Sequence, residues 1–158
     1  MTASGERDGC VFCAARDSDD EAASLVVHRG TSGFVLLNLY PYNNGHLMVV
    51  PNRHIPDLTS ATPAELAELM ELARLSEMVL TEICQPHGLN MGINLGRPAG
   101  AGILDHIHLH VVPRWAGDTN FMSVVGDVRV LPEELPQTAA KMRPVFARLS
   151  RQERQAHV

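Results

Sequence analysis

The sequence predicts a fold in which β-strands and a long α-helix share one core, and three segments carry this prediction. Two apolar runs, residues 33–39 and 46–50, flank the turn-forming stretch 40–45, which is typical of a β-hairpin. Residues 63–84 have the end signals and apolar spacing of a helix. Residues 106–114 alternate histidine with branched apolar residues, and this period of two predicts a strand.

The predicted helix has clear start and stop signals. Thr62 is a good N-cap, Pro63 fits the first helical position, and Glu65 stands where a capping box needs an acid. Pro86 and Gly88 end the run. Between these ends, apolar residues recur three or four positions apart with one polar break at Glu77; they are Leu66, Leu69, Met70, Ala73, Leu80, Ile83 and Cys84.

Composition indicates one domain with an ordinary core. The chain has 158 residues, and its 45% hydrophobic and 20% charged content is typical of a globular protein. We expect residues 1–9 to be a flexible N-terminus and residues 10–158 to form a single domain. From Pro132 onward the sequence favours a C-terminal helix with one apolar face, interrupted by Pro136 and Pro144.

Charge and cysteine content argue against several classes of partner. A net charge of −5 without a basic cluster disfavours a nucleic-acid duplex or an anionic membrane as partner. No apolar run approaches the roughly 18 residues of a membrane span, and the start lacks a signal-peptide pattern, so we expect a cytoplasmic location. Three cysteines do not suit a disulfide framework in a chain of this size, which favours reduced thiols or metal ligation.

The histidines at alternate positions of the last predicted strand point to phosphate chemistry. His106, His108 and His110 share one face of that strand, while the residues between them are buried on the other. The first and third lie too far apart along a strand to bind one metal ion together, so we expect them to divide the work. His108 at the centre is the candidate nucleophile, because neutral imidazole can attack phosphorus. His110 is the candidate phosphate contact and acid.

Two other interpretations of these histidines stay open. A His-x-His strand can ligate a catalytic metal, but the carboxylates that this needs are few: Asp105 points to the opposite face, and Asp118 follows eight residues after His110. From its own surroundings, His46 in the hairpin is more typical of a hydrogen-bonded core histidine than of a ligand contact.

Residues 88–102 hold five of the twelve glycines and lead into the histidine strand. Close approach of the backbone to a ligand, with amide groups facing phosphate oxygens, is one reason for such a density. A pair of tight turns is the other. The neighbouring histidines favour phosphate, which makes Gly100 and Gly102 candidate nucleotide contacts.

Cys10 and Cys13 have the spacing of half a zinc site, which two more ligands would complete. His54 and His106 are the candidates for the missing pair. A redox C-x-x-C is the competing interpretation, but that motif follows a central strand, and nothing before Cys10 resembles one. Zinc is therefore favoured, and Cys84 is interpreted as a small buried apolar residue.

Residues 106–112 resemble the signature of the histidine triad (HIT) family of nucleotide hydrolases and transferases, in which three histidines alternate with apolar residues. The resemblance extends from Cys10 to Phe121, and the matching positions are Asn38, Gly45, His46, residues 51–54, Asn94 and residues 114–121. It implies an α+β HIT-like fold: a five-stranded antiparallel sheet with one long helix and a C-terminal helix. The family also implies a homodimer.

The resemblance assigns roles to matching residues of this chain. It implies that His108 forms a nucleotidyl-histidine intermediate while His110 and His46 contact the phosphate, and that Asn38 binds ribose and Asn94 a phosphate. In zinc-containing members the metal ligands match four positions here: Cys10, Cys13, His54 and His106. Because four protein ligands leave no open position, we expect a structural Zn²⁺.

One departure bears on the reaction. Hydrolase branches of the family place Gln four residues before the first triad histidine, where this chain has Gly102. Together with residues 114–121, this resembles bacterial members similar to diadenosine tetraphosphate phosphorylases, in which orthophosphate accepts the nucleotidyl group. We expect cleavage of a dinucleoside polyphosphate, with an adenine nucleotide as substrate. The alternatives are hydrolysis of adenosine phosphoramidates or related nucleotide conjugates, and a nucleotide-binding module without catalysis.

Overall fold

A five-stranded antiparallel sheet forms the centre of the computed structural model, which describes residues 9–118 and 133–156. The strands lie in the order β1-β2-β3-β5-β4. Their bounds are Val26–Arg29 (β1), Gly33–Leu37 (β2), Leu47–Pro51 (β3), Gly88–Ile93 (β4) and Leu109–Arg114 (β5). All four neighbouring pairs are antiparallel, which confirms the expected sheet.

The predicted hairpin is the β2–β3 pair. Its register joins Gly33 to Pro51 and Leu37 to Leu47, so the turn-forming residues 38–46 make the connection. The glycine at the end of this connection has a structural reason: Gly45 has a φ of 84°, and a Cβ there would lie 3.2 Å from Leu80 of the long helix. Only glycine therefore lets the chain enter β3 so close to the helix.

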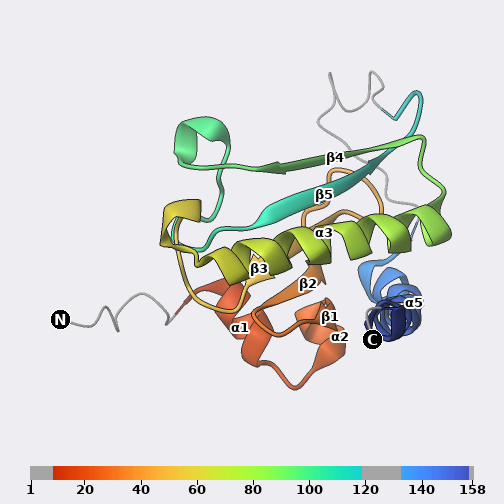
Figure 1. Cartoon of the computed structure of the whole chain (residues 1–158). Coiled ribbons are helices and arrows are strands. Elements are labelled where there is room, and N and C mark those ends of the chain that lie inside the picture. The colour runs from red at the N-terminus through yellow and green to blue at the C-terminus, as the bar shows by residue number, and fades with distance from the viewer. Residues whose placement is uncertain (1–8, 119–132, 157–158) are drawn as a thin grey trace.

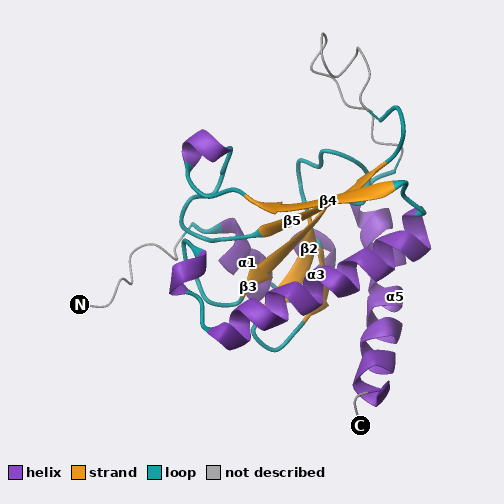
Figure 2. Cartoon of the chain, turned by 45° about the horizontal axis from the view of Figure 1, so that its top comes forward, coloured by secondary structure: helices purple, strands orange, loops and turns teal. Residues whose placement is uncertain are grey.

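The helices cover the two faces of the sheet unequally. The long helix α3 (Pro63–Cys84) and the C-terminal helix α5 (Leu135–Ala156) pack together on one face, with α3 lying across the strands (Figure 1). The short helices α1 (Val11–Asp17) and α2 (Glu21–Ser24) precede β1, and single 3-10 turns η1 (Leu58–Ser60) and η2 (Arg97–Ala99) lie in connections. Figure 2 shows η2 at the opposite end of the sheet from α5. No helix within residues 9–118 and 133–156 is long and apolar enough to cross a bilayer.

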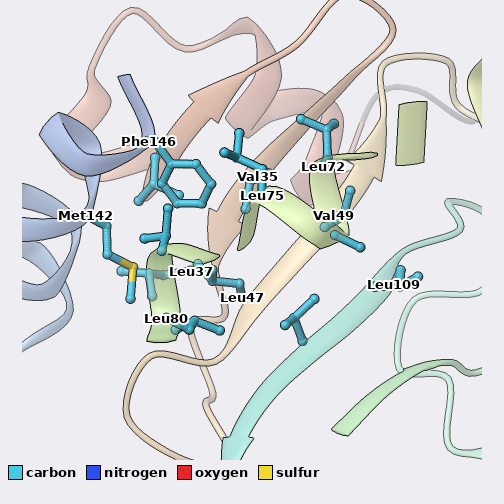
Figure 3. Close-up of a cluster of buried hydrophobic side chains, with 14 of the residues drawn as sticks. Val35, Leu37, Leu47, Val49, Leu72, Leu75, Leu80, Leu109, Met142 and Phe146 are labelled. Atoms are coloured by element: carbon cyan, nitrogen blue, oxygen red, sulfur yellow. The ribbon is translucent and has the colours of Figure 1, made fainter. Parts of the chain in front are cut away.

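Branched apolar side chains fill the space between the sheet and the two long helices (Figure 3). Phe146 and Met142 come from α5, and both are fully buried against strand and α3 residues. A second, smaller group of buried residues lies on the other face: Phe12, Val26, Phe34, Leu36, Met48 and Val50. Alternation along β2 and β3 thus buries both faces of these strands, which explains their continuous apolar runs.

The capping prediction for α3 is confirmed. The Thr62 hydroxyl accepts from the Glu65 N–H at 3.3 Å, and the Glu65 carboxylate accepts from the Thr62 N–H at 2.8 Å. Pro63 stands at the first helical position. The helix ends as the sequence indicates, just before Pro86, with Gln85 in the left-handed conformation.

The C-terminal helix differs from the expectation in one respect, because neither proline interrupts it. Pro136 is the second residue of α5, where a backbone N–H has no intrahelical partner to lose. Pro144 lies inside the helix and costs a backbone hydrogen bond. Burial of Met142 and Phe146 on either side of it against the core outweighs that cost.

The histidine segment also differs in its bounds. The predicted strand 106–114 begins only at Leu109, because the Ile107 N–H donates to the Ile55 carbonyl outside the sheet at 2.7 Å. Residues 1–8 of the predicted flexible N-terminus lie outside the described residues. So do residues 119–121 of the family resemblance.

An ion pair between the long helix and the β3–η1 connection fixes the residue next to His54. Arg53 donates from Nε and Nη2 to the two carboxylate oxygens of Glu65 at 2.6 and 2.7 Å. These hydrogen bonds, with those from Thr62, lower the pKa of Glu65 from its ordinary 4.5 to about 2. The carboxylate therefore stabilises the folded state fully above about pH 4.5, and this contribution is lost as the pH falls toward about 2.

We predict that Glu65→Gln lowers the free energy of unfolding near neutral pH and that the difference from the wild type shrinks between about pH 5 and pH 2. Urea unfolding followed by circular dichroism across this range measures it. Glu71→Gln is the matched control, since Glu71 is an exposed partner of Arg74 on the same helix and a surface pair contributes little. A Glu65→Gln deficit that stays constant with pH would contradict the assignment.

Candidate functional site

Two of the triad histidines and His46 meet beside the β3–β5 pair. Met48 of β3 pairs with His110 of β5, so the start of β3 brings His46 against His110. The His46 Nε2 and His110 Nδ1 atoms lie 2.9 Å apart, and the ring centres of His108 and His110 lie 4.8 Å apart. His46 is fully buried and hydrogen-bonded, as its surroundings in the sequence indicated, and it also contacts the triad.

Backbone hydrogen bonds determine where the protons of this pair lie. The Tyr42 N–H donates to His46 Nδ1 at 3.1 Å, so the proton of neutral His46 is on Nε2. That proton is donated to His110 Nδ1, which leaves the proton of His110 on its own Nε2. Burial, with the neighbouring His108, lowers the pKa of His110 to about 4 and keeps the ring neutral near pH 7.

His108 has the opposite arrangement of protons. Its Nδ1–H donates to the His106 carbonyl at 3.0 Å, so Nε2 carries the lone pair. The ring is 6% exposed, and burial lowers its pKa despite the hydrogen bond to the carbonyl. A neutral imidazole with a defined lone pair, next to a neighbour with a defined N–H, is suited to nucleophilic attack on a phosphate.

The loop between β2 and β3 supplies two further groups. Asn38 accepts from the Tyr40 N–H at 2.9 Å, which turns its amide nitrogen toward His46 at 3.4 Å. The Tyr42 ring stacks on His46, with ring centres 4.9 Å apart and planes 25° from parallel. Tyr42 was not predicted as a site residue, because an aromatic residue beside Pro41 was interpreted only as part of a turn.

Tight turns, more than close approach to a ligand, account for two of the glycines of residues 88–102. Gly96 and Gly100 have φ values of 83° and 90°, so tight turns explain both. Asn94 donates to the Gly100 carbonyl at 3.4 Å, and no hydrogen bond within the described residues joins Asn94, Gly100 or Gly102 to the histidines. A Cβ on Gly102 would meet nothing within 4 Å, so the packing of the chain does not require glycine there.

The predicted metal ligands form a second group. Cys10, Cys13, His54 and His106 each offer one ligand atom, and these atoms all lie within 4.8 Å of one another. Cys10 Sγ lies 3.3 Å from His106 Nδ1, and Cys13 Sγ lies 3.4 Å from His54 Nδ1. A tetrahedral zinc ion with Zn–S of about 2.3 Å and Zn–N of about 2.0 Å holds sulfur and nitrogen ligands about 3.5 Å apart. The four residues therefore fit such an ion.

A hydrogen bond behind His106 turns its free nitrogen toward the cysteines. His106 is fully buried, and its Nε2–H donates to the Pro51 carbonyl at 2.9 Å, which leaves the lone pair on Nδ1 toward the cysteines. Burial lowers the pKa of His106 to about 4, so the ring is neutral as a ligand must be. His54 turns its Nδ1 atom toward the group. Its Nε2 atom is then buried without a hydrogen bond in the described chain, which costs free energy of folding.

The two competing interpretations find less support. Cys10 is the N-cap of α1, as in a redox motif, but the two thiols lie against histidines. A catalytic metal on His108 and His110 lacks ligands, since the metal-capable group in residues 9–118 and 133–156 contains neither of them. Asp118 instead accepts from Arg114 Nε at 2.6 Å and from Asn43 at 2.8 Å.

Comparison with known proteins agrees with this geometry. The family model described as the HIT domain matches residues 19–117, which is more than half of the chain. An "AP-4-A phosphorylase" of Mycobacterium tuberculosis is 46% identical over 131 residues, which cover 83% of this chain and 66% of that protein. The chain thus spans slightly less than two thirds of that relative. A "bis(5'-nucleosyl)-tetraphosphatase [asymmetrical]" of Schizosaccharomyces pombe is 34% identical over 95 residues, 60% of this chain and 52% of that protein.

A solved structure gives the same fold. A zinc-bound histidine triad family protein from Mycobacterium smegmatis superposes with a TM-score of 0.72 at 26% identity, covering 92% of this chain and 99% of that one. A histidine triad nucleotide-binding protein from Sulfolobus tokodaii gives 0.71 at 26% identity, with 90% and 95% covered. The triad, the antiparallel sheet and the matched model together identify the family, and this chain belongs to the HIT domain family.

Proposed function

We propose that this chain cleaves dinucleoside polyphosphates, with diadenosine tetraphosphate as substrate, by transferring a nucleotidyl group through His108. The observation that carries the proposal is the opposed proton placement: His108 offers a lone pair on Nε2, and neighbouring His110 offers an N–H. The named activities of the relatives from M. tuberculosis and S. pombe support this substrate class.

The reaction has two steps. In the first, His108 Nε2 attacks the phosphorus of one adenylyl group; the N–P bond forms, the P–O bond to the rest of the substrate breaks, and ATP leaves. The Nε2–H of His110 stabilises the negative charge that develops on the phosphate oxygens, and His46 holds His110 in this tautomer by donating to its Nδ1. In the second step an oxygen of orthophosphate attacks the same phosphorus, the N–P bond breaks, and ADP leaves. Water as acceptor would give AMP instead.

Orthophosphate is the acceptor we favour. Gly102 stands where hydrolase branches carry Gln, and a Cβ there would meet no protein atom within 4 Å, so the position has space for a second phosphate. We assign the phosphate and ribose contacts to the residues expected from the family: Asn38, Asn94, Gly100 and Gly102. Hydrolysis is the second candidate, because the S. pombe relative is named as a tetraphosphatase.

We predict that the wild type converts diadenosine tetraphosphate to ADP and ATP only with orthophosphate, and that His108→Ala abolishes turnover while nucleotide binding persists. Product separation by ion-exchange chromatography and calorimetric titration measure the two properties. His87→Ala is the control, since His87 is exposed and its side chain accepts only from the Ala116 N–H among the described contacts. Near-normal turnover by His108→Ala would reject the mechanism.

Other products would select the alternatives. AMP and ATP without a phosphate requirement would identify a hydrolase. Turnover of an adenosine phosphoramidate in preference to the dinucleotide would identify a hydrolase of nucleotide conjugates. Tight nucleotide binding without turnover of either would identify a binding module.

We further propose that Cys10, Cys13, His54 and His106 hold a structural Zn²⁺. The sulfur–nitrogen distances of 3.3 and 3.4 Å and the Zn-bound relative from M. smegmatis support this metal. A four-ligand zinc site supplies a cross-link and no water for catalysis. Here it would join α1, the segment after β3 and the segment before β5.

We predict that Cys10→Ser with Cys13→Ser removes bound zinc and lowers the melting temperature by several degrees or more. Plasma emission spectrometry measures the zinc, and scanning calorimetry measures the melting. Cys84→Ala is the matched control: this third thiol, at the end of α3, packs against the main hydrophobic core and lies outside the ligand group. Unchanged zinc content in the double variant would remove the metal from this account.

Dimerisation is a third proposal. Among the described residues, β4 is one of the two outer strands of the sheet, and Met91 on it is 41% exposed, so the edge of β4 is open to pairing with a second copy. We predict that Met91→Lys shifts the protein toward monomer in sedimentation velocity, whereas Leu58→Lys on η1, an exposed residue outside the sheet, leaves the state unchanged. A wild type that sediments as a monomer would refute the proposal.

The cytoplasmic location stays a prediction from the sequence.

A further inference from the structure

Phe12, which lies between the two cysteines of the ligand group, contacts the nucleophile. Its side chain is 1% exposed, on the first turn of α1. The Phe12 ring centre lies 4.9 Å from that of His108 with planes 50° apart, and 5.5 Å from that of His106 with planes 82° apart. One aromatic side chain therefore packs against a predicted metal ligand and against the predicted nucleophile.

Besides its contact with the His110 ring, His108 has two contacts that come from the segments carrying the predicted metal ligands. The first is the hydrogen bond from Nδ1 to the carbonyl of His106, which fixes the proton. The second is the Phe12 ring, which lies against the imidazole and restricts its rotation. Since Nε2 must point at phosphorus, rotation of the ring by a few tens of degrees would misalign the attack.

The position of Phe12 depends in turn on the cysteines. Helix α1 has seven residues, and its N-cap Cys10 makes no capping hydrogen bond, so the helix is too short to be stable without tertiary contacts. Its anchors include the burial of Phe12 and the placement of Cys10 and Cys13 against the two histidines, besides hydrogen bonds that Arg16 makes near the end of the helix. Ligation of the cysteines would thus also hold Phe12.

We infer that Phe12 is a positioning residue for His108, and that the ligand group controls the orientation of the nucleophile through Phe12 and the His106 carbonyl. The metal site is then coupled to the reaction as well as to stability. This inference rests on the proposed role of His108, and its test therefore includes a measurement that needs no turnover.

The test compares Phe12→Leu with Phe34→Leu. Both phenylalanines are 1% exposed and belong to the same buried group, so the two substitutions remove the same ring from the same layer. Of the two phenylalanines, only Phe12 has a ring contact with the triad in the described chain. Zinc is added to one equivalent and its content measured in each protein, and melting temperatures quantify the loss of packing.

We expect Phe12→Leu to lower kcat about tenfold while KM changes by less than about twofold, and Phe34→Leu to change neither beyond that margin. The decisive readout is the ring nitrogen spectrum of His108 in ¹⁵N-labelled protein. In the wild type and Phe34→Leu it should report protonation at Nδ1, and in Phe12→Leu a mixture of the two tautomers. Chelation of zinc from the wild type should produce the same mixture.

The outcomes separate this inference from the proposed function. A Phe12→Leu spectrum as well defined as that of Phe34→Leu overturns the positioning role, whatever the turnover. A wild-type spectrum unchanged by chelation overturns the coupling to the metal site. If the wild type turns over no dinucleotide, the proposed function fails, and the spectra still decide whether Phe12 holds the His108 ring.

Discussion

The hydrogen bond from His108 Nδ1 to the His106 carbonyl connects the two halves of the site. It fixes the proton on Nδ1 of the proposed nucleophile and leaves the lone pair on Nε2, and its acceptor belongs to His106, whose side chain faces the cysteines. The neighbouring residue, Ile107, is held by the Ile55 carbonyl outside the sheet ladder. The segment before β5 is therefore held by contacts outside the sheet. The regular strand begins at Leu109, one residue before His110.

The division of labour among the histidines follows from the sheet. Alternation puts the triad on one side of the segment, but the neighbours along that side differ: a cysteine pair next to His106, an aromatic ring against His108, and the start of β3 beside His110. Two backbone groups, the Tyr42 N–H and the His106 carbonyl, then set opposite proton placements on His46 and His108. The triad segment thus offers a candidate metal ligand at His106 and, at His108 and His110, groups suited to nucleophilic and acid–base chemistry.

Local signals predicted the parts of this fold that local chemistry determines. The capping box at Thr62 and Glu65, the turn ending at Gly45 and the Cys10–Cys13 spacing are short-range patterns, and the structure contains all of them. Strand β4 was not predicted from its own residues, because its glycines are more typical of a loop. Its formation depends on pairing with β5, which is distant in sequence. The expected break at Pro144 was wrong because core burial outweighs the low helix propensity of proline there. Phe12 and Tyr42 could not be predicted next to the histidines from the sequence. The fold determines their contacts, with the His108 ring and the His46 ring respectively.

The central claim is that a covalent nucleotidyl group forms on His108. The measurement that tests it most directly is rapid quenching, at alkaline pH, of the zinc-loaded protein mixed with excess diadenosine tetraphosphate without orthophosphate, followed by peptide mass spectrometry. The account predicts an adenylyl adduct on the peptide that contains His108, and its loss with release of ADP when orthophosphate is added. Substrate consumption with no adduct at any time point, or with the adduct on another residue, would contradict it.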